Sequence, residues 1–483
     1  MSTAKSRDTS VDMCNGPLFS KIILFSIPVM LSNMLQMLYN AADQVVVGQF
    51  AGSDALGAVG STGSLFNLIV CLVMGLSVGS SSIVARYFGA GDSEAVSRAV
   101  HSSMLLSVIS GSIIGVIGFF SARPLLVLMK TQPDVLDDAV LYMQILFAGL
   151  PLVAVYNFGS AVLRAIGDTK RPMYFLILSG IINVVLNVIF VAGFHMSVDG
   201  VALATVISQA IAGIMVVVWL TKSEGSYKLV LSKLRLYKTE CLQIIKLGVP
   251  AGIQSSMFSL SNIVMQSSIN SISKAAVSGC TAAATLDSLI YQAMNALYHA
   301  SLSFCGQNYG AKKHGRIMKS FLYCSGIVTV IGLIIGTFVH IFAGPLLGIF
   351  IKDNPEAVAH GIERLRLTCI PYFLCGIMEV SCGALRSMNR SVITLINSVL
   401  GACVFRVIWV YTVFAASPSI HTLFISYPVS WALTAAMHTV IFLLVYFKIK
   451  KSDPPEQNSG ESKNADKQLC TSASSSGEEN SIK

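Results

Sequence analysis

One carboxylate stands inside an apolar stretch near the start of the chain. The segment Pro28–Gly48 reads PVMLSNMLQMLYNAADQVVVG, and Asp43 is its single charged residue. An acid in a membrane-spanning segment costs roughly 2.5–3.5 kcal/mol, so it usually faces the protein interior or a water-filled cavity. Asp43 is therefore a candidate for holding a proton or a cation. The alternative is an acid near the membrane surface.

The composition of the chain is that of a membrane protein. Hydrophobic residues make up 54% of its 483 residues, charged residues only 12%, and the mean hydropathy is +0.69. Soluble chains carry about 25% charged residues, so we expect a polytopic membrane protein. The net charge of +9 comes from basic residues in short loops, which does not suggest a nucleic-acid partner. The eleven cysteines form no CxxC pair, so we predict neither a disulfide nor a metal cluster.

Twelve apolar segments are long enough to cross a membrane, because a hydrocarbon core of ~30 Å needs ~20 helical residues. The predicted helices run over 18–48, 55–82, 96–120, 136–162, 173–194, 199–221, 241–270, 276–304, 317–341, 357–383, 391–415 and 424–447. We therefore expect an all-α fold with twelve transmembrane helices. Pro28 lies within the first helix, where it removes a backbone hydrogen bond and permits a conformational kink.

Basic residues are concentrated in alternate loops, and this asymmetry sets the orientation. If the N-terminus is cytoplasmic, most Lys and Arg residues fall on the inside, as the positive-inside rule requires. We therefore expect a cell-membrane protein with both termini in the cytoplasm. The sequence also predicts a polar N-terminal tail at 1–16, a basic linker at 222–240 and a disordered tail at 451–483.

The two halves of the chain repeat one another at a spacing of about 220 residues. Ala161–Arg164 resembles Gly383–Arg386, and three further short matches follow the same order. An even number of helices in each repeat makes the repeats parallel, an arrangement typical of secondary transporters. We predict two pseudo-symmetric six-helix lobes, 17–221 and 241–450, around a central cleft.

The chain resembles the multidrug and toxic compound extrusion (MATE) family in four short motifs: Pro28 with Asp43 and VVVGQFAG, RYFGAGD, LRAIGDTKRPM and LRSMNRS. The resemblance covers 17–450 and is strongest to the bacterial DinF-like branch. Members of the family are twelve-helix antiporters. They export small organic compounds, often cationic or amphipathic, against an inward flow of protons or sodium ions. The resemblance implies the same activity here, with H+ or Na+ as the coupling ion and no other cofactor.

The resemblance also implies a cation-coupling site in the N-terminal lobe. Matching the family pattern gives Asp43, Asn183, Asn187 and Thr205. The family usually has a second carboxylate where this chain has Asn187, so Asp43 is expected to be the sole acid of the site. Asn183 and Asn187 stand four residues apart and face one side of their helix. There they either ligate a transient sodium ion or hold neighbouring helices together.

Four residues are predicted to line a substrate pocket in the N-terminal lobe. Gln36 and Tyr39 precede Asp43 by seven and four residues, so they share its helical face. Asn157 and Met173 complete the predicted pocket, because Met and aromatic side chains adapt to varied amphipathic ligands. The alternative for each residue is ordinary packing.

The second lobe carries a fixed positive charge where the first has an amide. In the repeat, Glu379 corresponds to Asn157 and Arg406 to Asn187. We therefore predict no cation site in this lobe and an ion pair between Glu379 and Arg406, since unpaired charge is costly at this depth. The alternative is that Glu379 binds substrate.

These features predict a secondary active antiporter rather than an enzyme. The sequence contains no P-loop and no cluster of catalytic acids, histidines or cysteines. We expect a monomer whose partners are small-molecule substrates and membrane lipids. The alternative function is a lipid-linked oligosaccharide flippase of the same superfamily, for which longer basic cavities and extra helices are expected.

Overall fold

The fold is helical throughout the described part of the chain. The computed structural model describes residues 10–129, 131–351 and 354–452. Within these residues, nine helices are long and apolar enough to cross a membrane, or ten if the bent pair Pro355–Thr368 and Tyr372–Ser387 is one span. Two further long helices lie where spans are predicted at 241–270 and 276–304. Each of the twelve predicted segments therefore coincides with helical structure.

The first half of the chain forms six long helices. They are α1 (Leu18–Val46), α2 (Gly52–Gly89), α3 (Ser93–Leu128), α4 (Pro133–Ala165), α5 (Lys170–Asn187) and α6 (Val198–Lys222). Helix α1 continues through Pro28, so the predicted kink there stays a prediction. Two π-helical segments extend these helices, η1 (Val47–Ala51) after α1 and η2 (Val188–Gly193) after α5.

The second half begins after a linker that contains the short helix η3 (Leu231–Lys233). Its helices are α7 (Lys238–Asn270), α8 (Lys274–Gly310), α9 (His314–Ile341), α10 (Ala343–Phe350), α11 (Pro355–Thr368), α12 (Tyr372–Ser387), α13 (Ser391–Ser398), η4 (Val399–Val404), α14 (Phe405–Trp409), η5 (Val410–Phe414), α15 (Ile420–Phe424) and α16 (Ser426–Ser452). Helices α11 and α12 meet at 50°. Pro371 at their junction has no N–H to continue the helix.

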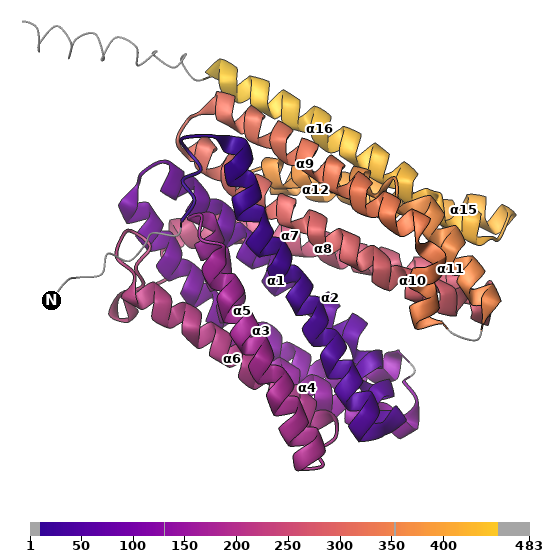
Figure 1. Cartoon of the computed structure of the whole chain (residues 1–483). Helices are drawn as coiled ribbons and strands as arrows, with labels where there is room; N and C mark the ends of the chain where they lie inside the picture. Colours follow the sequence, from indigo (N-terminus) through magenta and orange to yellow (C-terminus); the bar gives the residue numbers. More distant parts are fainter. Residues whose placement is uncertain (1–9, 130, 352–353, 453–483) are drawn as a thin grey trace, which may run out of the picture. The chain divides into compact units, whose positions relative to one another are not determined.

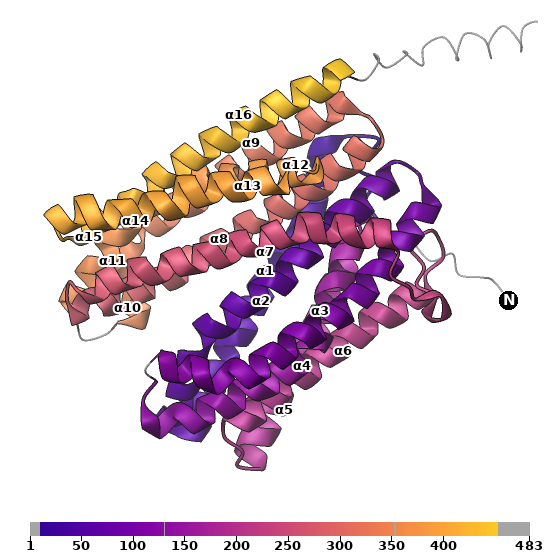
Figure 2. The ribbon, with the colours of Figure 1, turned by 180° about the vertical axis from the view of Figure 1, so that it is seen from behind.

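Helix α2 packs along α7 (Figure 1, and Figure 2 from behind). Gly75 and Gly79 on α2 face Gly248 and Gly252 on α7, and a Cβ at Gly75 would lie 2.2 Å from the backbone nitrogen of Gly252. Glycines four residues apart let membrane helices approach closely. This contact joins the two halves of the chain, and α1 against α8 is its counterpart in the repeat.

The chain divides into two compact units, Met1–Phe442 and Leu443–Lys483. The contacts named below all lie in the first unit, which contains most of both predicted lobes. The lobe boundaries themselves stay a prediction. Of the two predicted tails, residues 1–9 and 453–483 lie outside the described part of the chain.

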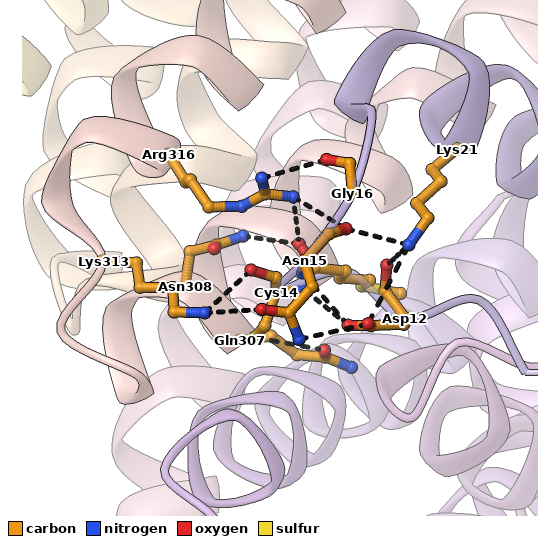
Figure 3. Close-up of polar contacts among 10 residues, drawn as sticks. Asp12, Cys14, Asn15, Gly16, Lys21, Gln307, Asn308, Lys313 and Arg316 are labelled. Carbon is orange, nitrogen blue, oxygen red and sulfur yellow. Dashed lines mark hydrogen bonds and ion pairs between the residues drawn. The ribbon is translucent and has the colours of Figure 1, made fainter. Parts of the chain in front are cut away.

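The segment just before α1 packs against both halves of the chain. Val11 donates a backbone hydrogen bond to the carbonyl oxygen of Gly167 at 3.0 Å, and Met13 is fully buried. From α8 and α9, Asn308 and Arg316 donate to the Met13 carbonyl oxygen at 3.1 and 3.2 Å. Figure 3 shows these two donors beside the segment before α1. This part of the predicted N-terminal tail is therefore ordered, and it ties the α4–α5 turn to the α8–α9 turn.

The ends of α2 and α8 meet in a reciprocal contact. A Cβ at Gly89 would lie 1.9 Å from the carbonyl oxygen of Gln307, and a Cβ at Gly310 would lie 1.9 Å from that of Arg86. The ends of the two helices thus face each other, and each presents a glycine to the backbone of the other. Side chains larger than glycine do not fit at either position without a shift of backbone.

Candidate functional site

Asp43 lies near the end of α1, with its side chain turned into the protein. Only 8% of its surface is exposed. Asn187 of α5 donates from Nδ2 to Asp43 Oδ1 at 2.5 Å, and Thr205 of α6 donates from Oγ1 to Asp43 Oδ2 at 3.3 Å. The fold therefore brings α1, α5 and α6 together at this acid. Asn187 and Thr205 are 144 and 162 positions from Asp43 in the sequence.

Asn183 completes this polar cluster one helical turn before Asn187. Its Oδ1 accepts from Asn187 Nδ2 at 3.3 Å, and its Nδ2 donates to Thr205 Oγ1 at 3.5 Å. Asn183 and Asn187 are both buried, with exposed fractions of 4% and 0%. The four residues predicted for cation coupling thus form one hydrogen-bonded cluster, named here the Asp43 cluster. Their role in coupling stays a prediction.

Asp43 has only neutral hydrogen-bond partners among the described residues. The ion pairs in that part of the chain involve other acids, and Asp43 contacts amide and hydroxyl groups. An ionised carboxylate buried without a cation costs several kcal/mol. The Oδ1 atom of Asn187 is also buried and has no hydrogen-bond partner there. The Asp43 cluster therefore combines an unbalanced acid with an unused acceptor oxygen.

Two irregular helical segments border the Asp43 cluster. The N–H of Val47, the first residue of η1, bonds back to the carbonyl oxygens of Asp43 and Gln44. Segment η2 begins at Val188, directly after Asn187, and it contacts η1. A π-helical turn widens the helix locally and is frequent at functional sites. Asp43 and its donor Asn187 thus lie beside two π-helical segments that contact each other, one at the end of α1 and one at the end of α5.

Tyr142 of α4 is a neighbour of the cluster that the sequence did not reveal. It is buried, and it lies within electrostatic range of Asp43. No local pattern distinguishes this tyrosine from other aromatic residues in apolar segments. Only the packing of α4 against the remaining helices brings it near the acid.

Tyr39 links α1 to α5 through a hydrogen bond and through packing of its ring. Its hydroxyl donates to the carbonyl oxygen of Leu176 at 2.9 Å. The ring lies directly against Gly180, where an added Cβ would be 1.7 Å from the ring carbon Cζ. The tyrosine occupies space that only a glycine leaves open, so its position is set by packing between the two helices.

The other three residues predicted to bind substrate share no hydrogen bond within the described chain. Gln36 is exposed, Met173 is half-buried, and Asn157 donates to the carbonyl oxygen of Val153 in its own helix at 2.9 Å. A cavity of about 260 Å³ lies between α3 and α4 and is lined by other residues, mostly apolar. The predicted substrate pocket therefore stays a prediction.

The predicted ion pair between Glu379 and Arg406 is absent from the described residues. Arg406 instead donates from Nε to Ser430 Oγ at 3.0 Å, and its guanidinium lies 4.0 Å from the centre of the Tyr427 ring. An aromatic face attracts a guanidinium electrostatically, so this arginine is stabilised without a carboxylate. The acid of Glu379 has Arg386 as the basic residue within its electrostatic range.

A buried ion pair that the sequence did not predict joins α8 to α11. Arg364 donates to Asp287 Oδ2 from Nε at 3.1 Å and from Nη2 at 2.8 Å. Thr368 donates to the other carboxylate oxygen at 3.2 Å. Both charged side chains are about nine-tenths buried. Asp287 is therefore paired with a cation, whereas Asp43 is not.

Comparison with known proteins identifies the family. The MatE family model matches residues 28–189 and again residues 250–412. The two matches begin at Pro28 and Pro250, which confirms the internal repeat. The probable multidrug resistance protein YpnP of Bacillus subtilis (strain 168) is 31% identical over 397 residues, which are 82% of this chain and 88% of the relative. The FAD transporter of Shewanella oneidensis is 24% identical over 80% of this chain and 85% of its own.

Solved structures show the same architecture. The outward-facing structure of a multidrug resistance MATE family transporter of the MOP superfamily gives a TM-score of 0.86 at 24% identity. The match covers 92% of this chain and 99% of that one. The predicted all-α, polytopic fold is thereby confirmed, and the relatives are transporters rather than enzymes. The DinF-like branch stays a prediction. The chain belongs to the MatE family, the multidrug and toxic compound extrusion transporters.

Proposed function

We propose that the protein is a secondary active antiporter coupled through Asp43. It exports small organic compounds, including cationic and amphipathic ones, from the cytoplasm in exchange for inward protons or sodium ions. The observation that carries the proposal is the burial of Asp43 among neutral partners. Because an ionised acid without a cation is unfavourable there, the cluster favours occupancy by a proton, a sodium ion or a cationic substrate.

The same cluster offers chemistry for either coupling ion. A protonated Asp43 needs an acceptor for its O–H, and a half-turn of the Asn187 amide presents the unused Oδ1. A sodium ion needs several oxygen ligands, as hard cations do. The carboxylate of Asp43, the hydroxyl of Thr205 and the amide oxygens of Asn183 and Asn187 supply such a set. Either ion neutralises the acid and excludes the other occupants, and this exclusion links inward ion flow to outward substrate flow.

Transport then requires the two repeats to rock about the site, as in other transporters built from repeats. We place the end of the molecule that carries the α2–α8 contact in the cytoplasm, because the basic loops indicate that orientation. Opening this end would separate Gly89 from Gln307 and Gly310 from Arg86. It would also release the segment before α1 from one of its two attachment points.

The proposal includes the setting in which the protein works. It acts as a monomer in the cell membrane, with both termini in the cytoplasm, surrounded by lipids and binding small-molecule substrates. The names of the relatives, a multidrug resistance protein and an FAD transporter, support an organic substrate. Substrate identity is then set by the predicted pocket of the N-terminal lobe, with Gln36, Tyr39, Asn157 and Met173.

The test is export of ethidium by purified protein in proteoliposomes, with proton and sodium gradients imposed separately. One of the two gradients is expected to drive export by the wild type, and Asp43→Asn is expected to abolish it. Asp137→Asn is the matched control, since Asp137 is 81% exposed and pairs with Arg123 on the surface. Export that responds to neither gradient would remove the antiporter proposal. Movement of a lipid-linked oligosaccharide without such a gradient would favour the flippase alternative.

A further inference from the structure

Two arginines at equivalent positions of the repeat have no carboxylate partner among the described residues. Arg164 stands in the last turn of α4 and Arg386 in the last turn of α12. Arg386 is 7% exposed and Arg164 is partly buried, and the Nε atoms of both are buried without a hydrogen-bond partner. Neither guanidinium forms an ion pair in the part of the chain that the structure describes.

The hydrogen-bond partners of Arg386 are neutral groups. Arg386 donates from Nη1 to the hydroxyl of Tyr298 at 2.6 Å and from Nη2 to Gln254 Oε1 at 2.9 Å. The Arg164 side chain has no hydrogen bond to any described residue, and the phenols of Tyr156 and Tyr298 lie within its electrostatic range. A guanidinium has five N–H donors, so the two arginines hold most of their donors unused.

Helix α8 brings the two positive charges together. His299 lies within electrostatic range of both guanidinium groups. Its neighbour Tyr298 bonds to Arg386 and lies within range of Arg164. Helix α8 packs against α12 and contacts α4, so cations from opposite halves of the repeat converge on the same stretch of α8. The acid of Glu379 stands two turns before Arg386 on α12. It lies within electrostatic range of that guanidinium but forms no ion pair with it in the described part of the chain.

Two cations at a buried junction, with one acid, Glu379, within range of Arg386 and no ion pair to either guanidinium among the described residues, are energetically unfavourable. The carbonyl ends of α4 and α12 offset part of each charge through the helix dipole. They do not satisfy the N–H donors of the side chains, as the buried Nε atoms show. A carboxylate, phosphate or sulfonate would both offset the positive charge and accept hydrogen bonds from the N–H donors. Hydrogen bonds between a guanidinium and such an anion are charge-assisted and can be bidentate.

We propose that Arg164 and Arg386 form an anion site that binds the acidic group of organic substrates between the two halves of the protein. The inference rests on the proposed function and extends its substrate class from cations to compounds that carry an anionic group. Each half contributes one arginine, so movement of one repeat against the other changes the distance between them. The bound group is therefore held in one arrangement of the repeats and released in the other.

The test compares two fluorescent probes, the organic anion fluorescein and the organic cation ethidium. Binding to the full-length protein is measured by fluorescence anisotropy in nanodiscs of neutral lipid, with no ion gradient. Arg164→Gln and Arg386→Gln are expected to weaken fluorescein binding about tenfold more than ethidium binding, because each removes charge-assisted hydrogen bonds to the anion alone. Arg123→Gln is the matched control, since this arginine is 62% exposed in a surface pair.

Unchanged fluorescein affinity in both glutamine variants would overturn the proposal, as would equal losses for both probes in protein that still unfolds cooperatively. Arg164→Lys and Arg386→Lys keep the charge and are expected to retain more affinity than the glutamine variants. Nanodiscs containing phosphatidylglycerol separate two sources of the anion. Displacement of fluorescein by this lipid assigns the site to a lipid headgroup, and persistence of binding assigns it to a soluble compound. Since no gradient is imposed, failure here leaves ion-coupled export untouched.

Discussion

Asn187 donates a hydrogen bond from Nδ2 to Asp43 Oδ1 across 2.5 Å, while its own Oδ1 has no partner among the described residues. The side chain that stabilises the ionised acid therefore also carries the acceptor that a protonated acid needs. The resemblance to the family predicts a carboxylate at this position, and this chain has a neutral amide there. The Asp43 cluster thus has one titrating acid and an amide that can serve either of its states.

Asn187→Ala removes both functions of the amide. Hydrogen bonds to charged groups contribute about 1.5–3 kcal/mol, so we expect gradient-driven ethidium export to fall by about tenfold or more. The measurement is the initial export rate in proteoliposomes. Asn270→Ala is the control, because Asn270 is exposed and its side chain accepts a hydrogen bond from Gln266 at 3.0 Å. Equal rates for the two variants would contradict the role given to Asn187.

Gly180→Ala tests the packing of α1 against α5. The new methyl group would overlap the ring of Tyr39, and overpacking of this kind costs about 1–3 kcal/mol. We expect a lower midpoint of thermal unfolding in detergent. Gly326→Ala is the control, since nothing lies within 4 Å of a Cβ at that position. In a Tyr39→Ala background the Gly180 substitution should cost much less, and an undiminished cost would rule out the ring as its cause.

Asp287→Ala tests the buried ion pair of α8 and α11. Removing one partner of such a pair leaves Arg364 uncompensated, at a cost of about 3–5 kcal/mol. Thermal unfolding should show a large loss of stability. Asp137→Ala breaks an exposed pair with Arg123, which is expected to cost less than about 1 kcal/mol. Similar effects of the two substitutions would show that Asp287 is not a structural acid.

The segment before α1 is expected to lose stability in acid. Burial acts to raise the pKa of Asp12, but hydrogen bonds from Asn15 and the Cys14 N–H, with the charge of Lys21, outweigh it and lower the pKa from 3.8. A pKa lowered in the folded state stabilises the fold above the unfolded value, and this contribution is lost as the pH falls through the folded value.

Asp12→Asn should therefore lower the unfolding midpoint at neutral pH and have progressively less effect below pH 3.8. The side chain of Asp12 is 54% exposed, so solvent screening keeps the contribution under about 1 kcal/mol. The measurement is thermal unfolding of the wild type and of Asp12→Asn, from neutral pH to below pH 3.8. A difference that does not shrink in acid would mean that the carboxylate charge is not what stabilises the segment.

The helices and the Asp43 cluster could be predicted because both leave patterns in the sequence that can be recognised without knowing the tertiary structure. Apolar length alone marks membrane-spanning helices, and a lone acid such as Asp43 is conspicuous among apolar neighbours. The spacing of Asn183 and Asn187 places both on one helical face. The family pattern then supplied the contact across helices, which no local signal contains.

Other features depend on packing that the sequence does not express locally. Arg406 was expected to pair with Glu379, yet it contacts Ser430 and the Tyr427 ring of α16 instead. Asp287 and Arg364 lie 77 positions apart, and only the folded α8 and α11 bring them together. Met13 is buried in a stretch predicted as a polar tail, because the surfaces that cover it come from distant turns.

Coupling through Asp43 is tested most directly by ion release on substrate binding. Ethidium is added to the purified wild type and to Asp43→Asn in weakly buffered solution, with a pH indicator and radioactive sodium present. The wild type is expected to release protons or sodium ions in proportion to the ethidium bound, because the cluster holds one occupant at a time. Asp43→Asn is expected to release neither. Equal ion release from the two proteins would contradict coupling through this acid.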